Sequence, residues 1–187
     1  ASGNVSAISN SVLITVDTVE PTISIGSDVS ELKVGEVATL TITLSESSTD
    51  FVLDDITATG GSITAFSGSG TSYQATFTPD DNFTGTAEIN VSSPKFFDAA
   101  GNTNEVSNIV TLTVDTVEPT ISIGSDVSTL KAGEQAQLTF TLSEASTDFT
   151  AEDITVTGGT ISGFSGSGTS YTATFTPTDN SNADGVI

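Results

Sequence analysis

The 187-residue chain contains no cysteine, histidine, methionine or tryptophan, and its only cationic side chains are three lysines. Without cysteine there is no disulfide framework and no thiol redox site. Without histidine there is no imidazole base for a hydrolase triad and no usual zinc or copper site. A glycosidase needs only two carboxylates, so the composition does not exclude that class of enzyme. The acidic pairs of this chain, however, recur in the turns of both repeats, where no cleft is expected. We therefore expect that the chain is not an enzyme.

Positive charge is nearly absent, and the formal net charge is -21. A chain of this charge repels phosphate backbones and anionic lipid headgroups, which argues against nucleic-acid binding. No apolar run is long enough to span a bilayer, so we expect no direct insertion into a membrane. The many carboxylates also repel one another, and compact packing of such a chain calls for counter-ions.

The main feature of the sequence is an internal repeat. Residues 17–30 read DTVEPTISIGSDVS, and residues 115–128 repeat them letter for letter at an offset of 98 positions. A unit of this length fits one immunoglobulin-like β-sandwich domain rather than a solenoid repeat. The register predicts the last strand of a preceding repeat in residues 1–16. It predicts a complete repeat in residues 17–114 and a second repeat, truncated before its last strand, in residues 115–187.

Apolar and polar residues alternate with period two along each unit, as in half-buried strands. Ala38, Leu40, Ile42 and Leu44, for example, share one face of a strand. Glycine pairs and Asp/Asn clusters mark the turns between such segments. We predict an all-β fold of tandem immunoglobulin-like sandwiches with about seven strands each. In the first unit they lie near residues 22–25, 36–44, 55–59, 62–66, 72–78, 86–91 and 106–114.

The start of the chain carries the repeat's register too, since residues 1–17 align with residues 99–115. One interpretation is that the sequence is a piece of a longer array, whose neighbouring repeats are its partners. The other is self-association by strand exchange, in which residues 1–16 of one molecule complete the open second unit of another.

Acidic residues are expected to converge where consecutive units meet. In a sandwich of this topology the loops gather at two poles, and only Asp115 and Thr116 link the two units. The candidate ligands at these poles are Asp17, Glu46, Asp81, Asp98, Asn102, Asp115 and Glu144. Calcium binds six to eight oxygens with tolerant geometry, so we predict structural calcium there. The alternative is that these acids are solvated loop residues that favour turns and solubility.

Several segments together resemble a known family: VDTVEPTISIGSDVS, LKVGEVATLTITLSE, DDITATGGSITAF, YQATFTP and FDAAGN. Their order and spacing are similar to the bacterial Ig-like repeats of giant RTX and biofilm-associated adhesins exported by type I secretion. The resemblance implies an extracellular, cell-surface location and calcium at the domain junctions. Glu20 and Glu118 depart from it, since a small residue often precedes that proline in the family. The RTX nonapeptide is absent from this sequence.

Three functions are compatible with these patterns. The leading hypothesis is a structural extender or spacer of a cell-surface adhesin, made rigid by calcium and supporting cell adhesion or biofilm formation. One alternative is an extracellular filament or matrix subunit that assembles by strand exchange. The other is a ligand-binding adhesin domain that recognises a glycan, which calls for an exposed aromatic patch in one unit.

Overall fold

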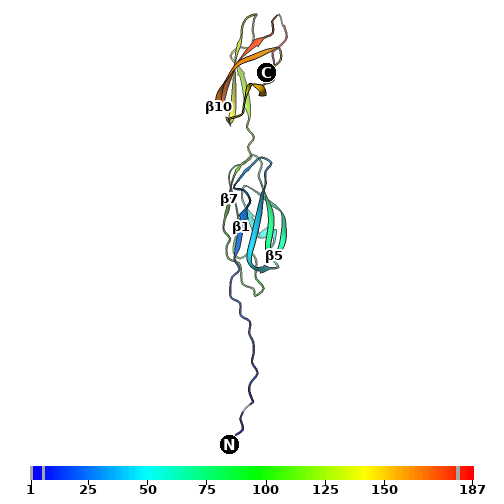
Figure 1. The fold of residues 1–187 in the computed structure, drawn as a ribbon, viewed down its shortest axis with the longest axis vertical. Coiled ribbons are helices and arrows are strands. Elements are labelled where there is room, and N and C mark those ends of the chain that lie inside the picture. Colours follow the sequence, from blue (N-terminus) through cyan, green and yellow to red (C-terminus); the bar gives the residue numbers. More distant parts are fainter. Residues whose placement is uncertain (1, 6, 180–181) are drawn as a thin grey trace. The chain divides into compact units, whose positions relative to one another are not determined.

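The structure is a computed structural model that describes residues 2–5, 7–179 and 182–187. The chain divides into two compact units, Ala1–Val117 and Glu118–Ile187. Each unit is built from β-strands, most of which pair antiparallel (Figure 1). The two are described separately below as unit 1 and unit 2.

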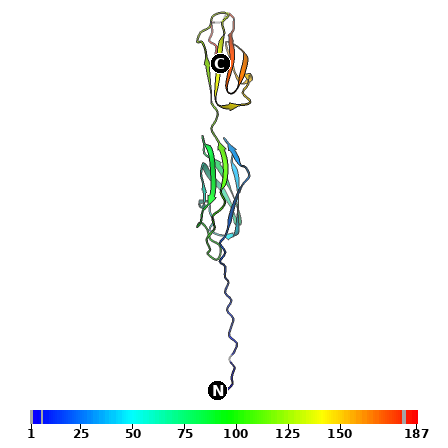
Figure 2. The same ribbon diagram turned by 90° about the vertical axis from the view of Figure 1, so that its left-hand side faces the viewer.

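Unit 1 is a sandwich of two sheets (Figure 2). The first sheet has the order β1-β3-β5, made of β1 (Ile23–Ser27), β3 (Ala38–Ser48) and β5 (Gly61–Pro79). The second has the order β2-β7-β6-β4, made of β2 (Glu31–Lys33), β7 (Val110–Asp115), β6 (Thr84–Val91) and β4 (Ile56–Ala58). All neighbours are antiparallel except β2 and β7, which pair in parallel. The expected all-β sandwich is confirmed.

The core of unit 1 lies between the two sheets. On β3, Leu40 and Ile42 are fully buried while the threonines that alternate with them are exposed. Leu112 on β7 is buried from the opposite sheet. Fully burying a side chain of this size contributes roughly 1.5–3 kcal/mol. The alternation of apolar and polar residues in the sequence therefore indicates which face of each strand is buried.

Strand β5 doubles back on itself, where the sequence predicted two separate strands. A Cβ built at Gly61 would collide with the backbone of Thr78 and the ring of Phe77, and one at Gly68 would collide with Ser72. The two halves of β5 are thus adjacent antiparallel segments, and together with β1 and β3 they make the four-segment sheet of an immunoglobulin-like sandwich. Gly68 has a φ of +130°, a conformation that side chains rarely adopt.

Other boundaries also differ from the prediction. Strand β2 was not predicted, because three residues with one apolar position show no alternation. Strand β7 begins at Val110 rather than 106: Ser107 N still donates to Val91 O, but Val91 N donates to the Ser107 hydroxyl and the Asn108 side chain binds Ile25 of β1. The expected start of a strand at residue 55 is a 3-10 turn, Leu53–Asp55, closed by Val52 N donating to Asp55 Oδ2 at 2.9 Å.

Unit 2 repeats the first sheet of unit 1. Its strands are β8 (Ile121–Ser125), β9 (Ala136–Ser146) and β10 (Gly159–Pro177), with a 3-10 turn at Ala151–Asp153. A single bridge between Thr157 and Val186 marks the second sheet among the residues that the structure describes in this unit. Residues 2–5 and 7–16 form no strand and are exposed.

Candidate metal centre

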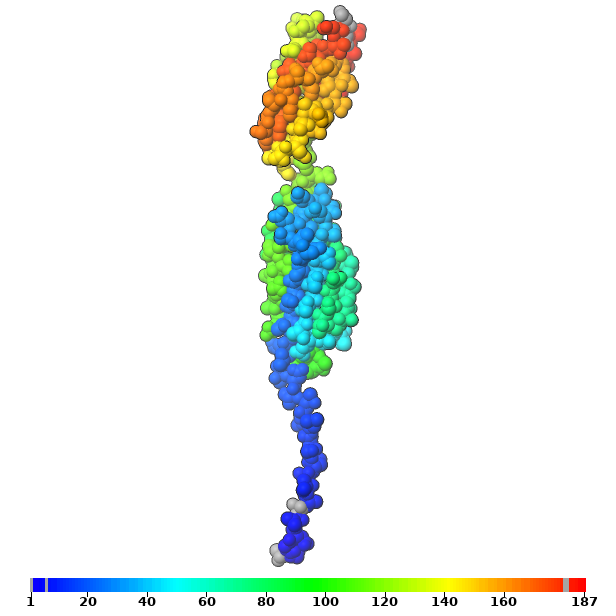
Figure 3. All heavy atoms as spheres, in the orientation of Figure 1, coloured from blue at the N-terminus to red at the C-terminus, as the bar shows by residue number. Residues whose placement is uncertain are grey.

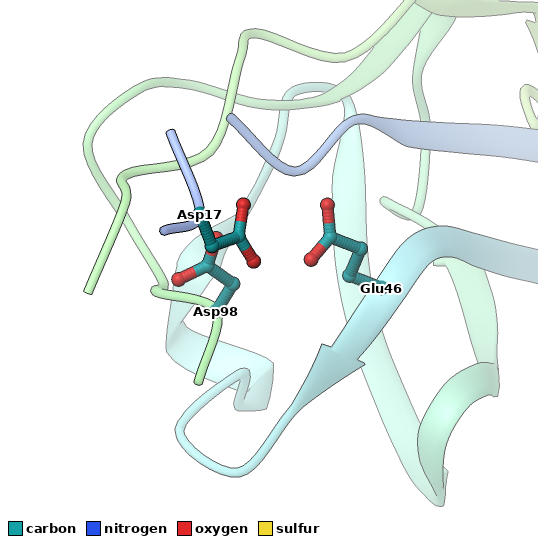
Figure 4. Close-up of side chains that lie close together, drawn as sticks. All are labelled: Asp17, Glu46 and Asp98. Atoms are coloured by element: carbon teal, nitrogen blue, oxygen red, sulfur yellow. The ribbon is translucent and has the colours of Figure 1, made fainter. Parts of the chain in front are cut away.

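Three carboxylates from distant parts of the chain meet in unit 1. Asp17 lies in the segment that leads into β1, Glu46 lies near the end of β3, and Asp98 lies in the loop between β6 and β7. One oxygen of each is within 4.8 Å of the other two, and the three groups point toward one another (Figure 4). The structure therefore brings together three of the predicted ligands.

Asp98 is held in place by its own loop. Its Oδ1 accepts hydrogen bonds from the backbone N–H groups of Ala100 (2.8 Å), Gly101 (2.7 Å) and Asn102 (2.9 Å). Its Oδ2 accepts one from Asn102 Nδ2 at 2.8 Å. The segment FDAAGN thus forms a tight turn around one carboxylate, whose Oδ2 retains acceptor capacity toward the cluster.

The environment shifts the pKa values of two of the three acids in opposite directions. Desolvation raises the pKa of Glu46, and the neighbouring charges of Asp17 and Asp98 raise it further. Desolvation also opposes the charged form of Asp98, but the hydrogen bonds from Asn102, Gly101 and Ala100 outweigh it and lower its pKa. The charged form of Asp98 is therefore stabilised, whereas desolvation and repulsion from the other two acids destabilise the charged form of Glu46.

The donor set fits a hard cation. Carboxylate oxygens are the ligands that calcium prefers, and its remaining coordination positions are commonly filled by backbone carbonyls and water. The carbonyl of Asp17 lies close to the same cluster, since Asn102 Nδ2 approaches it at 3.4 Å. Such a cation would relieve the repulsion that raises the pKa of Glu46.

The other predicted ligands lie elsewhere or play a different part. Asn102 directs its amide nitrogen at Asp98 and so positions that carboxylate. Asp115 accepts from Thr84 Oγ1 at 2.9 Å, outside the three-acid cluster. Asp81 is exposed in the turn between β5 and β6. Glu144 is a half-buried residue of β9 in unit 2, and its pairing with Asp115 of unit 1 stays a prediction.

Two asparagines in the segment between β6 and β7 were missed by the sequence analysis. The Asn104 side chain is buried; its Oδ1 accepts from Lys95 N (2.7 Å) and Phe96 N (3.1 Å) and its Nδ2 donates to Glu105 O (2.7 Å). Asn108 binds the backbone of Ile25. The run GNTNEVSN is the only signal that could have indicated them, because it is unusually rich in asparagine for a strand entry.

The tyrosines beside the Gly-Ser turns are core residues. Tyr73 stacks on Phe66 with ring centroids 5.4 Å apart, and Tyr171 stacks on Phe164 at 5.5 Å. Their hydroxyls donate to backbone carbonyls. Neither ring offers an exposed face for a sugar.

Comparison with known proteins identifies one family. A family model described as a bacterial Ig-like domain matches residues 17–114 and again residues 115–187. A search of curated proteins returned no match. Within the described residues, no helix is long and apolar enough to cross a membrane.

Two solved bacterial proteins are similar in structure. The Escherichia coli adhesin FdeC is 18% identical, with a TM-score of 0.43, over 84% of this chain and 55% of that chain. The Yersinia pseudotuberculosis adhesin InvE is 16% identical, with a TM-score of 0.36, over 84% of this chain and 51% of that chain. The chain thus spans about half the length of either structure. At these identities the likeness does not extend to what those proteins bind.

Proposed function

Because the chain belongs to the bacterial Ig-like domain family, we propose that it is a spacer segment of a cell-surface adhesin whose repeats are stiffened by calcium. In this proposal the chain lies outside the cell and has no catalytic role. Its repeats set the reach and rigidity of the protein and thereby support cell adhesion or biofilm formation.

The single observation that carries the calcium proposal is the convergence of Asp17, Glu46 and Asp98. Three carboxylates at this spacing are unfavourable without a cation, in a chain that has 24 acidic residues and only three lysines. Solvated loop acids, the alternative, have no need to point toward one another.

A calcium ion there would couple the entry of the chain to both sheets of unit 1. Asp17 belongs to the segment that precedes β1, whereas Glu46 belongs to the first sheet and Asp98 to a loop of the second. Calcium would therefore restrict the orientation of the residues that precede the unit. In a tandem array such a restriction at every junction makes a flexible string of domains stiffer.

From the repeat of the sequence alone we propose that Asp115 and Glu144 are ligands of a further calcium ion. Asp115 and Glu144 occupy the positions of Asp17 and Glu46 in the repeat. The turn at Asp115 copies that at Asp17, since Val117 N donates to Asp115 Oδ1 at 3.3 Å and Val19 N donates to Asp17 Oδ1 at 3.2 Å.

The proposal is tested by thermal melting and small-angle scattering with calcium and with a chelator. Calcium should raise the melting temperature of unit 1 and increase the maximum dimension of the particle, because ligand binding to the folded state stabilises it. A melting temperature and dimension that are the same in both conditions would refute the calcium part. The glycan-binding alternative gains no support from Tyr73 and Tyr171, since both are buried.

A further inference from the structure

In unit 1, strand β2 pairs in parallel with β7, the last strand of the unit. The register places the three residues of β2, Glu31–Lys33, opposite residues 113–115 at the end of β7. Thr113 N also donates to Ser30 O at 2.9 Å, next to this ladder. Leu32, the middle residue of β2, is 2% exposed, so the side chain between the paired strands is packed in the core.

Hydrogen bonds also join the segment before β7 to the segment around β1. Glu105 N donates to Pro21 O at 2.9 Å, and the Asn108 side chain binds both backbone groups of Ile25. Figure 3 shows these two parts of the chain, coloured blue and green, side by side in unit 1. The start of the unit is therefore joined to its end at several points from Pro21 to Lys33.

The direction of these strands decides what tension does to them. The chain enters unit 1 before β1 and leaves it after β7, and these two points lie at opposite ends of the sandwich (Figure 1). Tension along the chain therefore pulls β2 toward one end of the unit and β7 toward the other. Because the two strands are parallel and their hydrogen bonds run across them, the bonds are loaded together, in shear. A ladder that is pulled open from one end breaks one bond at a time instead.

Thr116, the residue that follows β7, is fixed to the turn between β5 and β6. Its hydroxyl donates to Asp80 O at 2.6 Å and accepts from Phe83 N at 2.9 Å, and its own N–H donates to Phe83 O at 2.8 Å. Its side chain is buried. A pull at the exit of the unit therefore acts on this anchored residue first and does not peel the end of β7 away from β2.

We propose that the β2–β7 ladder, with Thr116 as its anchor, makes unit 1 resist tension along the chain, because the whole ladder must rupture in shear before the unit unfolds. Forced unfolding is governed by the rate of unfolding under load and not by the free energy of unfolding alone. The same folded unit should therefore be strong along the chain and weak across the ladder. The use of this resistance in a tethered adhesin rests on the proposed function, whereas the strength of the ladder does not.

The test is single-molecule force spectroscopy on the full chain in two pulling geometries. The native sequence has no cysteine, so pairs of introduced cysteines define the points of attachment. Thr18→Cys with Glu118→Cys loads unit 1 along the chain and leaves the strands of unit 2 outside the load path. Glu31→Cys with Thr113→Cys pulls two directly opposite residues of the ladder apart. All four side chains are exposed, so the changes leave the core of unit 1 intact.

The force that unfolds unit 1 is expected to be several-fold higher along the chain than across the ladder. Equal forces in the two geometries, or a lower force along the chain, would overturn the proposal. Both measurements are made in a chelator, so that the result is independent of calcium and of the outcome of the calcium proposal.

A variant of the anchor provides a second test. Thr116→Val removes the hydroxyl but keeps the shape of the side chain, so it should lower the unfolding force along the chain and leave the force across the ladder unchanged. Thr111→Val, on the exposed face of β7, is the matched control and should lower neither force. An equal loss in both geometries for Thr116→Val would mean a general loss of stability and would overturn the role of Thr116 as the anchor.

Discussion

The side-chain amide of Asn108 holds both backbone groups of Ile25: Asn108 Nδ2 donates to Ile25 O at 2.8 Å, and Ile25 N donates to Asn108 Oδ1 at 2.9 Å. Ile25 is the middle residue of β1, an edge strand of the first sheet that pairs with β3 on its other side, so the Asn108 side chain takes the place of a neighbouring strand there. It also fixes the entry into β7, which begins two residues later at Val110.

Replacing Asn108 with alanine leaves the N–H and C=O of Ile25 without these partners. We expect Asn108→Ala to lower the free energy of unfolding of unit 1 by about 1–3 kcal/mol. Thr111→Ala, on the exposed face of β7, is the control and should have little effect. Urea denaturation followed by hydrogen exchange on peptides of unit 1 measures the difference, and equal stabilities would contradict the assignment.

Equivalent aromatic positions should differ between the two units. Phe51 is buried and its ring lies 5.1–5.6 Å from those of Phe66, Tyr73 and Phe96. Phe51→Ala should cost unit 1 about 3–5 kcal/mol. Phe149, at the same repeat position, is half-buried, so Phe149→Ala should cost unit 2 less. Calorimetry of the two variants checks the order, and a larger loss for Phe149→Ala would be inconsistent with the packing described.

The acids of the cluster predict how stability depends on pH in a chelator. The pKa of Glu46 is raised in the folded state, so folding favours its protonated form. Its contribution is most favourable at low pH and is lost as the pH rises through the raised pKa, above its ordinary value of 4.5. Glu46→Gln should abolish this loss near neutral pH. Melting temperatures across the acid range test it, with Glu88→Gln on exposed β6 as the control.

Asp98 predicts the opposite dependence. Its pKa is lowered in the folded state, so its contribution is present above the ordinary value of 3.8 and is lost as the pH falls through the lowered pKa. Asp98→Asn should remove this acid sensitivity. A melting curve at low pH that is as steep in Asp98→Asn as in the native chain would argue against the hydrogen-bonded turn.

Asn102 is expected to matter for calcium through Asp98. Its Nδ2 holds Asp98 Oδ2 at 2.8 Å, so Asn102→Ala should free that carboxylate and weaken calcium binding roughly 10- to 100-fold. Asn90→Ala on β6 is the control. Calcium affinities measured by calorimetry decide the matter, and equal affinities would mean that the turn holds Asp98 without this side chain.

Much of the fold could be predicted because its cause is local. Alternation along residues 38–44 identifies the buried face of β3, and the offset of 98 positions identifies the repeat. The topology of a sandwich also predicts that Asp17, Glu46 and Asp98 lie at one pole. Their identity as calcium ligands stays a prediction.

The remainder depends on contacts that no local pattern encodes. Strand β2 exists because Leu32 is buried beside β7, some eighty positions further along the chain. Asn104 and Asn108 are polar residues that satisfy backbone groups in distant segments, and only the folded structure shows which.

Calcium titration by isothermal calorimetry on the native chain, Glu46→Gln and Glu88→Gln tests the central claim most directly. The account predicts saturable binding to the native chain and to Glu88→Gln, and a loss of the strongest site in Glu46→Gln. No calcium binding to the native chain, or equal binding to all three proteins, would contradict it and would make the three acids ordinary surface charges.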